Sequence, residues 1–98
     1  MTKKPKLGPF VLIRTYSAGV HCGHLALRKG TEVTLHQARR IYSWNGAFTL
    51  NEIANAGVGA GSKLSAVTAE IVLTQAIEII TCSEVAAESL WKYPVYKP

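Results

Sequence analysis

The stretch from Phe10 to Leu35, FVLIRTYSAGVHCGHLALRKGTEVTL, decides the fold class of this chain. Its β-branched, aromatic and alternating residues fall into three runs that predict strands: Phe10 to Tyr16, Val20 to Arg28 and Thr31 to Leu35. Short polar or glycine-containing segments separate the runs and favour tight turns. Because strands joined by such turns run antiparallel, the stretch predicts a three-stranded meander.

The residues after the meander change to a helical period. Thr34 and Gln37 have the spacing of a capping box, in which two side chains bond the free amides at a helix start. Apolar residues then recur at every third position: Ala38, Ile41 and Trp44. The pattern predicts a short helix over His36 to Trp44.

A second capping box, Thr49 with Glu52, predicts another helix over Leu50 to Ala56 that ends at Gly57. The glycine-rich segment Gly57 to Ser65 then indicates a flexible loop.

The last third of the chain predicts two further strands, Val67 to Leu73 and Ile77 to Cys82. Ser83 is a suitable N-cap for a final short helix over Glu84 to Trp91. The order is therefore βββααββα. It describes an α+β fold, a small antiparallel sheet of about five strands with short helices on one side.

The length of 98 residues predicts a single domain over 1–98. Its core is expected over 10–91, with a basic N-terminal tail at 1–8 and an extended C-terminal tail at 92–98. A core this small is thin, so we expect a homo-oligomer. No apolar run approaches the roughly 20 residues of a membrane span, and the N-terminus does not resemble a signal peptide. We expect no membrane partner and a cytosolic location.

The formal net charge is +5, from eleven Lys and Arg against six Glu and no Asp. A basic excess favours anionic partners: a nucleotide or other small anion, a nucleic acid, or an acidic protein surface. Part of the excess, however, lies on the N-terminal tail at Lys3, Lys4 and Lys6, where it could serve solubility alone.

A basic and aromatic cluster is the best candidate for recognition. It comprises Arg39, Arg40, Tyr42 and Trp44, and the end of the first strand could add Arg14 and Tyr16. Guanidinium groups bind phosphate and stack on bases, and aromatic rings offer further stacking surface. The two arginines are expected to face outward from the predicted helix. The alternative is an amphipathic helix whose arginines are merely solvated.

The loop ending in Gly61-Ser62-Lys63 fails the requirements of a phosphate-binding Walker loop, because glycine must precede the lysine. Its amides and Lys63 could still contact an anion, or the loop could be a plain connector. His21, Cys22 and His24 with Cys82 offer an incomplete set of metal ligands, so we expect no metal and no cofactor. Without aspartate a Ser-His-Asp triad is excluded, and we expect no enzymatic activity.

Several segments carry a resemblance that covers about Val11 to Glu84. They are Arg14 to His21 (RTYSAGVH), Ala38 to Trp44 (ARRIYSW), Thr49 to Ala54 (TLNEIA) and Leu73 to Ile80 (LTQAIEII). In these segments the chain resembles a family of small proteins encoded by tailed phages and prophages. The family has no assigned activity, so the resemblance implies no catalytic residues.

The resemblance implies a location in the cytoplasm of an infected bacterial host, or in the virion. Small phage accessory proteins often counter host defence by stoichiometric binding. We therefore expect a non-enzymatic protein that sequesters a small anionic ligand of nucleotide type. A nucleic-acid-binding accessory protein, and a virion component or binder of a host protein, remain the alternatives.

Overall fold

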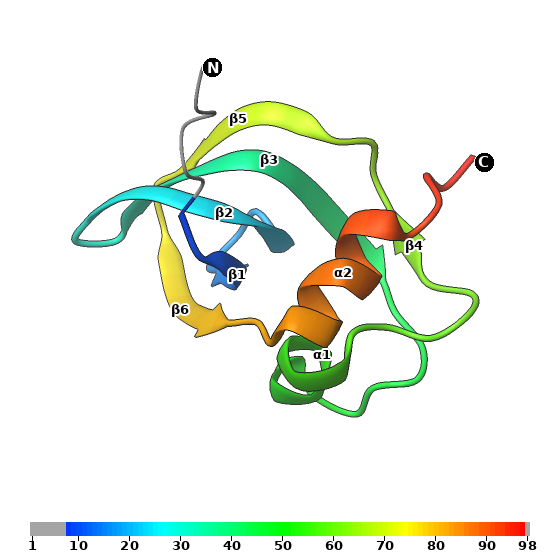
Figure 1. The fold of residues 1–98 in the computed structure, drawn as a ribbon. Helices are drawn as coiled ribbons and strands as arrows, with labels where there is room; N and C mark the ends of the chain where they lie inside the picture. Colours follow the sequence, from blue (N-terminus) through cyan, green and yellow to red (C-terminus); the bar gives the residue numbers. More distant parts are fainter. Residues whose placement is uncertain (1–7, 98) are drawn as a thin grey trace, which may run out of the picture.

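The computed structural model describes residues 8–97, which form six strands and two helices (Figure 1). In chain order they are β1 (Phe10–Thr15), β2 (Val20–Lys29), β3 (Glu32–Ser43), α1 (Leu50–Ala56), β4 (Lys63–Leu64), β5 (Thr68–Leu73), β6 (Ala76–Thr81) and α2 (Glu84–Lys92). The predicted α+β class is confirmed, as are the antiparallel sheet and the helices that follow Thr49 and Ser83.

The strands form one antiparallel sheet in the order β4-β3-β2-β1-β6. The predicted meander is its centre, with Ile13 of β1 opposite His21 of β2 and Ile79 of β6. β5 shares the outer edge of β3 with β4: β5 pairs with the first part of β3 and β4 with its end.

The predicted helix over 36–44 is wrong, because β3 continues as a strand to Ser43. Both edges of β3 bond to other strands, so its backbone groups are satisfied without a helix. Gln37 has a φ of 54°, and the pairing of β3 with β2 shifts by one residue between Cys22↔Arg39 and His24↔His36. This local bulge disturbs the alternation of side chains along β3.

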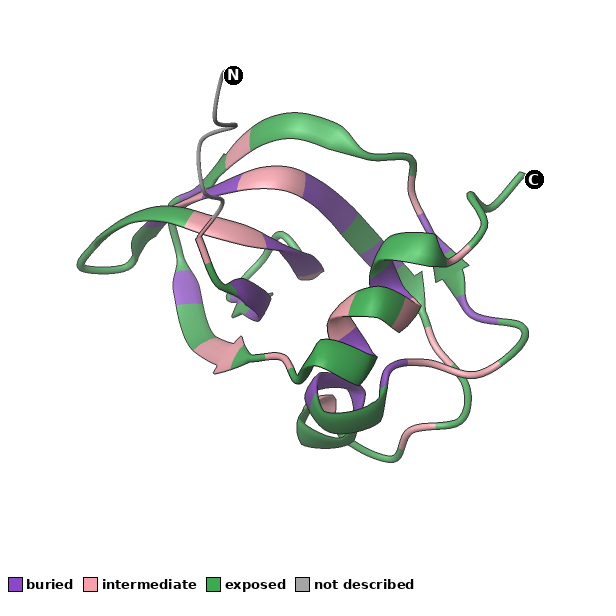
Figure 2. Cartoon of the chain, viewed as in Figure 1, coloured by how far each residue is buried: buried purple, intermediate pink, exposed green. Residues whose placement is uncertain are grey.

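Apolar side chains pack on both faces of the sheet. The helix-side core lies under α1 and α2 and contains Phe10, Leu12, Cys22, Ile41, Ile53, Ala54, Leu64 and Leu90. The inner core lies on the opposite face and contains Val11, Ile13, Val33, Leu35, Ala38, Leu73 and Ala76. Buried positions accordingly follow the centre of the sheet and the sheet-facing sides of the helices (Figure 2).

The inner core is covered by curvature of the sheet and not by a helix. β5 and β6 are consecutive in sequence, yet they pair with strands on opposite sides of β2. The sheet therefore curls until the Thr74-Gln75 turn joins its two sides (Figure 1). Backbone bonds from Ala76 to Thr31 and from Tyr16 to Gln75 fix this junction, at 3.0 Å each.

Side-chain hydrogen bonds cap the start of each helix. Thr49 Oγ1 accepts from the Glu52 amide, and Glu52 Oε2 accepts from the Phe48 amide at 2.7 Å. Ser83 Oγ accepts from the Ala86 amide at 3.0 Å and starts α2. None of the helices in the described range is long and apolar enough to cross a membrane.

The segment after α1 is held in place by its own polar groups. Gly59 donates from its amide to the Asn45 carbonyl, and Ser62 donates from its amide to Tyr93 Oη at 2.9 Å. The segment then forms β4, which the sequence analysis did not predict. The predicted extended end of the chain lies against this strand, where Tyr96 donates from its amide to the Leu64 carbonyl. The predicted basic tail lies outside the described residues except for Gly8.

Candidate functional site

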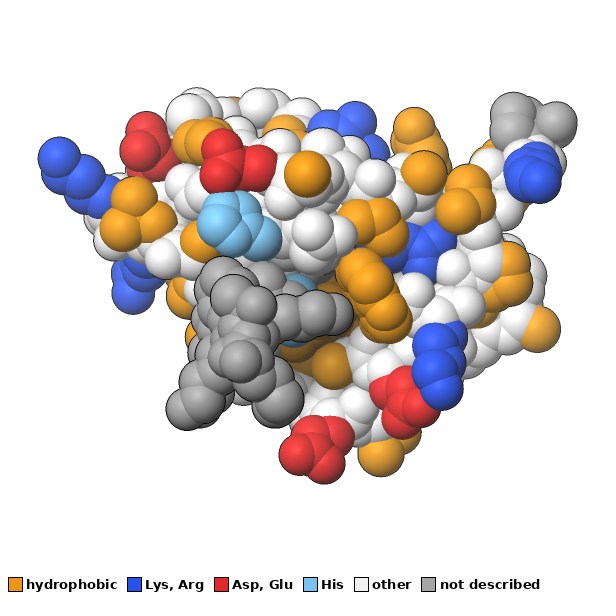
Figure 3. Space-filling view, turned by 45° about the horizontal axis from the view of Figure 1, so that its top comes forward, with side chains coloured by type: hydrophobic (Ala, Val, Ile, Leu, Met, Phe, Trp, Pro, Cys, Tyr) orange, Lys and Arg blue, Asp and Glu red, His pale blue; other side chains and the backbone are white. Residues whose placement is uncertain are grey.

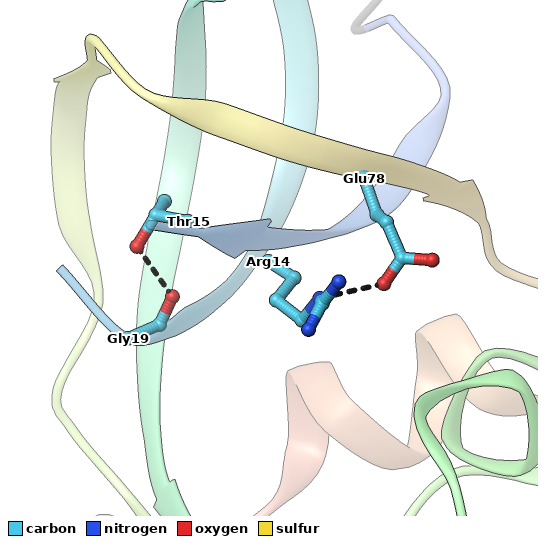
Figure 4. A network of polar contacts seen from close by, with 4 residues as sticks. All are labelled: Arg14, Thr15, Gly19 and Glu78. Carbon is cyan, nitrogen blue, oxygen red and sulfur yellow. Dashed lines mark hydrogen bonds and ion pairs between the residues drawn. The ribbon is translucent and has the colours of Figure 1, made fainter. Parts of the chain in front are cut away.

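The structure places the seven predicted site residues in different environments. Leu12 belongs to the helix-side core, so Arg14, two residues further along β1, lies on that same face of the sheet. Its Nε lies 2.7 Å from Glu78 Oε1 on β6, and both side chains are about half exposed (Figure 4). Arg40 lies two residues after Ala38 of the inner core, so it occupies the other face.

Tyr16 and Trp44 also lie apart from the centre of the predicted cluster. Tyr16 is 78% exposed and lies beside the β5–β6 turn. Its amide donates to the Gln75 carbonyl in that turn. Trp44 is partly buried against the helix-side core. Neither side chain lines the hollows described below.

Arg39 is buried, with 2% of its surface exposed, and does not face outward as the helix prediction required. Its Nε donates to the Ser65 carbonyl at 2.7 Å, and its Nη1 donates to the carbonyls of Leu90 and Tyr93 at 2.8 and 2.6 Å. Burial lowers the pKa of this guanidinium below its ordinary value. Arg39 therefore secures the end of α2 against the sheet.

Three of the predicted residues, Arg40, Tyr42 and Lys63, line two adjoining hollows on the surface. We call these the Arg40 hollow and the Lys63 hollow. The Arg40 hollow is lined by His21, Ala38, Arg39, Arg40, Tyr42, Ser65, Thr68 and Ile71. The Lys63 hollow is lined by Tyr42, Ser43, Lys63, Ser65, Ala66 and Tyr96. Tyr42 and Ser65 belong to both, so the hollows form one continuous surface.

Ser65 forms the rigid boundary between the two hollows. Its hydroxyl accepts from the Arg40 amide at 2.8 Å, and its own amide donates to the Arg40 carbonyl at 2.9 Å. Its carbonyl accepts from Arg39. These bonds fix the backbone from which the Arg40 side chain extends into solvent.

His21 contributes a neutral polar group to the Arg40 hollow. The side chain is 1% exposed, and Nε2 lies 2.9 Å from the Ala18 carbonyl, which can only accept. Burial is the main cause that lowers the pKa of His21, and the charge of Arg40 acts in the same direction against the Ala18 bond. The imidazole therefore carries its proton on Nε2, and Nδ1 remains an acceptor without a partner among residues 8–97.

The Lys63 hollow combines a cation with two phenol rings. Tyr42 is 64% exposed and Tyr96 is 42% exposed. Lys63 Nζ lies 5.0 Å from the centroid of the Tyr96 ring, within range of a cation–π interaction. The C-terminal segment is held beside β4, so it supplies Tyr96 as a fixed wall.

No carboxylate is among the described residues that line the two hollows. Ion pairs in the described range join Arg14 to Glu78, His36 to Glu70 and Lys92 to Glu88, and none involves Arg40 or Lys63. Both cations therefore keep their charge available to an anion.

A model of one protein family covers most of this structure. The family is described as a domain of unknown function (DUF6948), and the match spans residues 8–90. The chain belongs to the DUF6948 family. The expected membership of a family without an assigned activity is thus confirmed, and the phage origin stays a prediction. The searches of curated proteins and of solved structures gave no match.

His21, Ser65 and Tyr96 were not among the candidate binding residues of the sequence analysis, yet all three line the hollows. His21 was assigned only to an incomplete metal set, and no group of three metal-binding side chains is found in residues 8–97. Tyr96 lies far from Tyr42 in sequence and meets it only because the chain returns along β4. No pattern in the sequence links Tyr96 to Lys63 or to Tyr42.

Some amides of the glycine-rich loop of the DUF6948 domain already donate within the fold. The amides of Gly57, Gly59 and Ser62 already donate to Ile53, Asn45 and Tyr93, respectively. Lys63 and Ser65 are the residues of this loop that line the hollows.

Proposed function

We propose that this DUF6948 domain is a non-enzymatic binding protein that captures a small anionic ligand of nucleotide type. The observation that carries the proposal is the continuous surface that the two hollows form together. It offers Arg40 and Lys63 beside the rings of Tyr42 and Tyr96, with no carboxylate among its described lining residues. Guanidinium and ammonium groups bind phosphate, and phenol rings stack on bases.

The chemistry of the surface favours capture over turnover. His21 is the one group in the described lining that could act as a base near neutral pH, and its Nε2 is already bonded to the Ala18 carbonyl. The Ser65 hydroxyl in the same hollow already donates to the Ala66 carbonyl. Both cysteines of the chain lie elsewhere, and burial raises their pKa values to about 12 for Cys22 and about 11 for Cys82. Their thiols stay protonated and weakly nucleophilic.

The distribution of charge on one face of the molecule favours a small ligand over a long nucleic acid. On the face drawn in Figure 3, basic side chains are scattered singly and do not form a continuous stripe. A protein that follows a phosphate backbone needs such a stripe. Nucleic-acid binding remains the second candidate because the net charge is +5 and the lysine-rich N-terminus could extend the contact.

The resemblance to small phage proteins supports stoichiometric capture as the mode of action. In this proposal the ligand is a defence signal in the cytoplasm of an infected bacterium. A homo-oligomer is part of the proposal, because exposed apolar side chains such as Phe48 and Val85, at 88% and 67%, are available for contacts between copies. Light scattering coupled to size-exclusion chromatography tests the oligomer independently of the ligand.

The proposal is tested by calorimetric titration with a panel of nucleotides and a single-stranded oligonucleotide. The variant Arg40→Ala/Lys63→Ala should lower nucleotide affinity by about 100-fold, since two charged contacts are lost. The control Arg28→Ala/Lys29→Ala removes the same charge at the exposed β2–β3 hairpin and should change affinity by less than about twofold. Equal loss in the two variants contradicts the proposal. Binding of the oligonucleotide alone, with a steep salt dependence, favours the second candidate.

A further inference from the structure

The two hollows differ in size and chemistry. The Arg40 hollow is the smaller, about 250 Å³ against about 590 Å³ for the Lys63 hollow. The smaller one is lined by two arginines and a buried imidazole. The larger one is lined by Lys63, an alanine and two phenol rings, one of which, Tyr42, also lines the smaller hollow. A ligand that fills both must therefore have a compact polar end and a flat aromatic end.

We infer that the two hollows are separate subsites, the Arg40 hollow for a phosphate monoester and the Lys63 hollow for a nucleobase. The ligand class is then a nucleoside monophosphate or another nucleotide with a terminal phosphate. This inference rests on the proposed function and adds that the site is divided into a phosphate subsite and a nucleobase subsite.

The donor and acceptor pattern of the Arg40 hollow selects a monoester. Arg40 supplies N–H donors that pair with phosphate oxygens. Because Nε2 of His21 is bonded to the Ala18 carbonyl, Nδ1 is the ring nitrogen that can accept a hydrogen bond from a ligand in this hollow. A singly protonated phosphate monoester offers both kinds of group, oxygens for Arg40 and a P–OH for His21. A phosphodiester has no P–OH and leaves Nδ1 unpaired.

The arrangement also predicts proton uptake on binding. A phosphate monoester in water loses its second proton near a pKa of about 6, so it is mostly a dianion above neutral pH. In the site we expect one proton to lie between the phosphate and His21 Nδ1. The other groups that face His21 are the Ala18 carbonyl in the β1–β2 turn and Arg40 on β3, and neither releases a proton.

The test is calorimetry with the whole chain and four kinds of probe: the four ribonucleoside monophosphates, their nucleosides, inorganic phosphate and 3′,5′-cyclic AMP. We expect a monophosphate to bind at least about tenfold more tightly than its nucleoside, than phosphate and than the cyclic diester. Titration at about pH 7.5 in buffers of different ionisation enthalpy should show net proton uptake.

Two variants assign the subsites. Arg40→Met should lower monophosphate affinity by about tenfold and leave nucleoside affinity unchanged. Tyr96→Leu should weaken nucleoside and monophosphate by the same factor, about fivefold. Arg28→Met, at the distant hairpin, is the matched control for loss of charge and should bind as the wild type does.

The outcomes separate this inference from the proposed function. If a nucleoside or the cyclic diester binds as tightly as the monophosphate, or if Arg40→Met weakens nucleoside equally, the division into subsites is overturned while nucleotide capture stands. If the wild type binds no nucleotide at all, both fail.

Discussion

Arg39 Nη1 donates to the carbonyl oxygen of Tyr93 at 2.6 Å, and this bond joins β3 to the residue that ends α2. The same guanidinium also donates to the Leu90 carbonyl, near the C-terminal end of the helix. A cation at that end complements the helix dipole and satisfies carbonyls that have no partner within the helix. Two adjacent arginines, 39 and 40, therefore have different roles.

The first prediction separates these roles by stability. Arg39→Leu should lower the free energy of unfolding by about 3 kcal/mol, because three buried or partly buried carbonyls lose a charged donor. Arg40→Leu removes an exposed side chain and should change the free energy by less than about 0.5 kcal/mol. Urea denaturation of both variants is the measurement. Similar losses in the two would show that Arg39 does not secure α2.

Most of the fold could be predicted from local patterns in the sequence. β1 and β2 are rich in β-branched and apolar residues and are separated by short turns, so their pairing follows directly. Thr49 and Ser83 mark the starts of both helices because hydroxyl caps act over only three residues. These features are local, and a single sequence contains them.

The course of β3 could not be predicted because it depends on distant partners. Ala38 packs in the inner core and Ile41 in the helix-side core, so both faces of the strand are buried. Residues three apart lie on the same face of a helix but on opposite faces of a strand. Here the spacing arises because each face of β3 packs in a different core. The bulge at Gln37 removes the remaining alternation.

The candidate site could be predicted only in part for the same reason. Arg40 and Tyr42 share a face of β3 because they are two residues apart, and a strand assignment would have placed them together. Arg39 was assigned to the same surface because a helix would expose both arginines. Tyr96 depends on the parallel bridge between Leu64 and Val95, for which no local pattern exists.

The second prediction concerns the glycine that ends α1. Gly57 has a φ of 84°, and a Cβ at this position would lie 2.4 Å from Ser89 Cβ in α2. Gly57→Ala must therefore separate the two helices, and we expect a loss of at least about 2 kcal/mol in urea denaturation. Gly30 has a φ of 60° with nothing within 4 Å of such a Cβ. Gly30→Ala should cost only the backbone strain, about 1 kcal/mol, and an equal loss would exclude the clash with α2.

The third prediction concerns the two thiols. Because burial raises the pKa of Cys22 to about 12 and that of Cys82 to about 11, both are protonated in the folded protein at neutral pH. Iodoacetamide at about pH 8 should label them slowly in the native state and rapidly in urea, since the thiolate is the reactive form. Mass spectrometry over time gives the two rates. Rapid native labelling at Cys22 would mean that the helix-side core opens readily.

The last prediction is a loss of stability in mild acid that depends on His21. Burial lowers the pKa of this side chain in the folded state, whereas in the unfolded chain it protonates near pH 6.5. Below that pH the unfolded state therefore binds more protons than the folded state, and the free energy of unfolding falls as pH falls towards the lowered folded pKa. Urea midpoints at about pH 7.5 and about pH 5 measure the loss, which His21→Asn should reduce. His36→Asn changes an exposed imidazole beside Glu70 and should retain at least the loss seen in the wild type. If His21→Asn loses as much stability as the wild type over this range, the acid sensitivity arises elsewhere and His21 is not the buried neutral base that the Arg40 hollow requires.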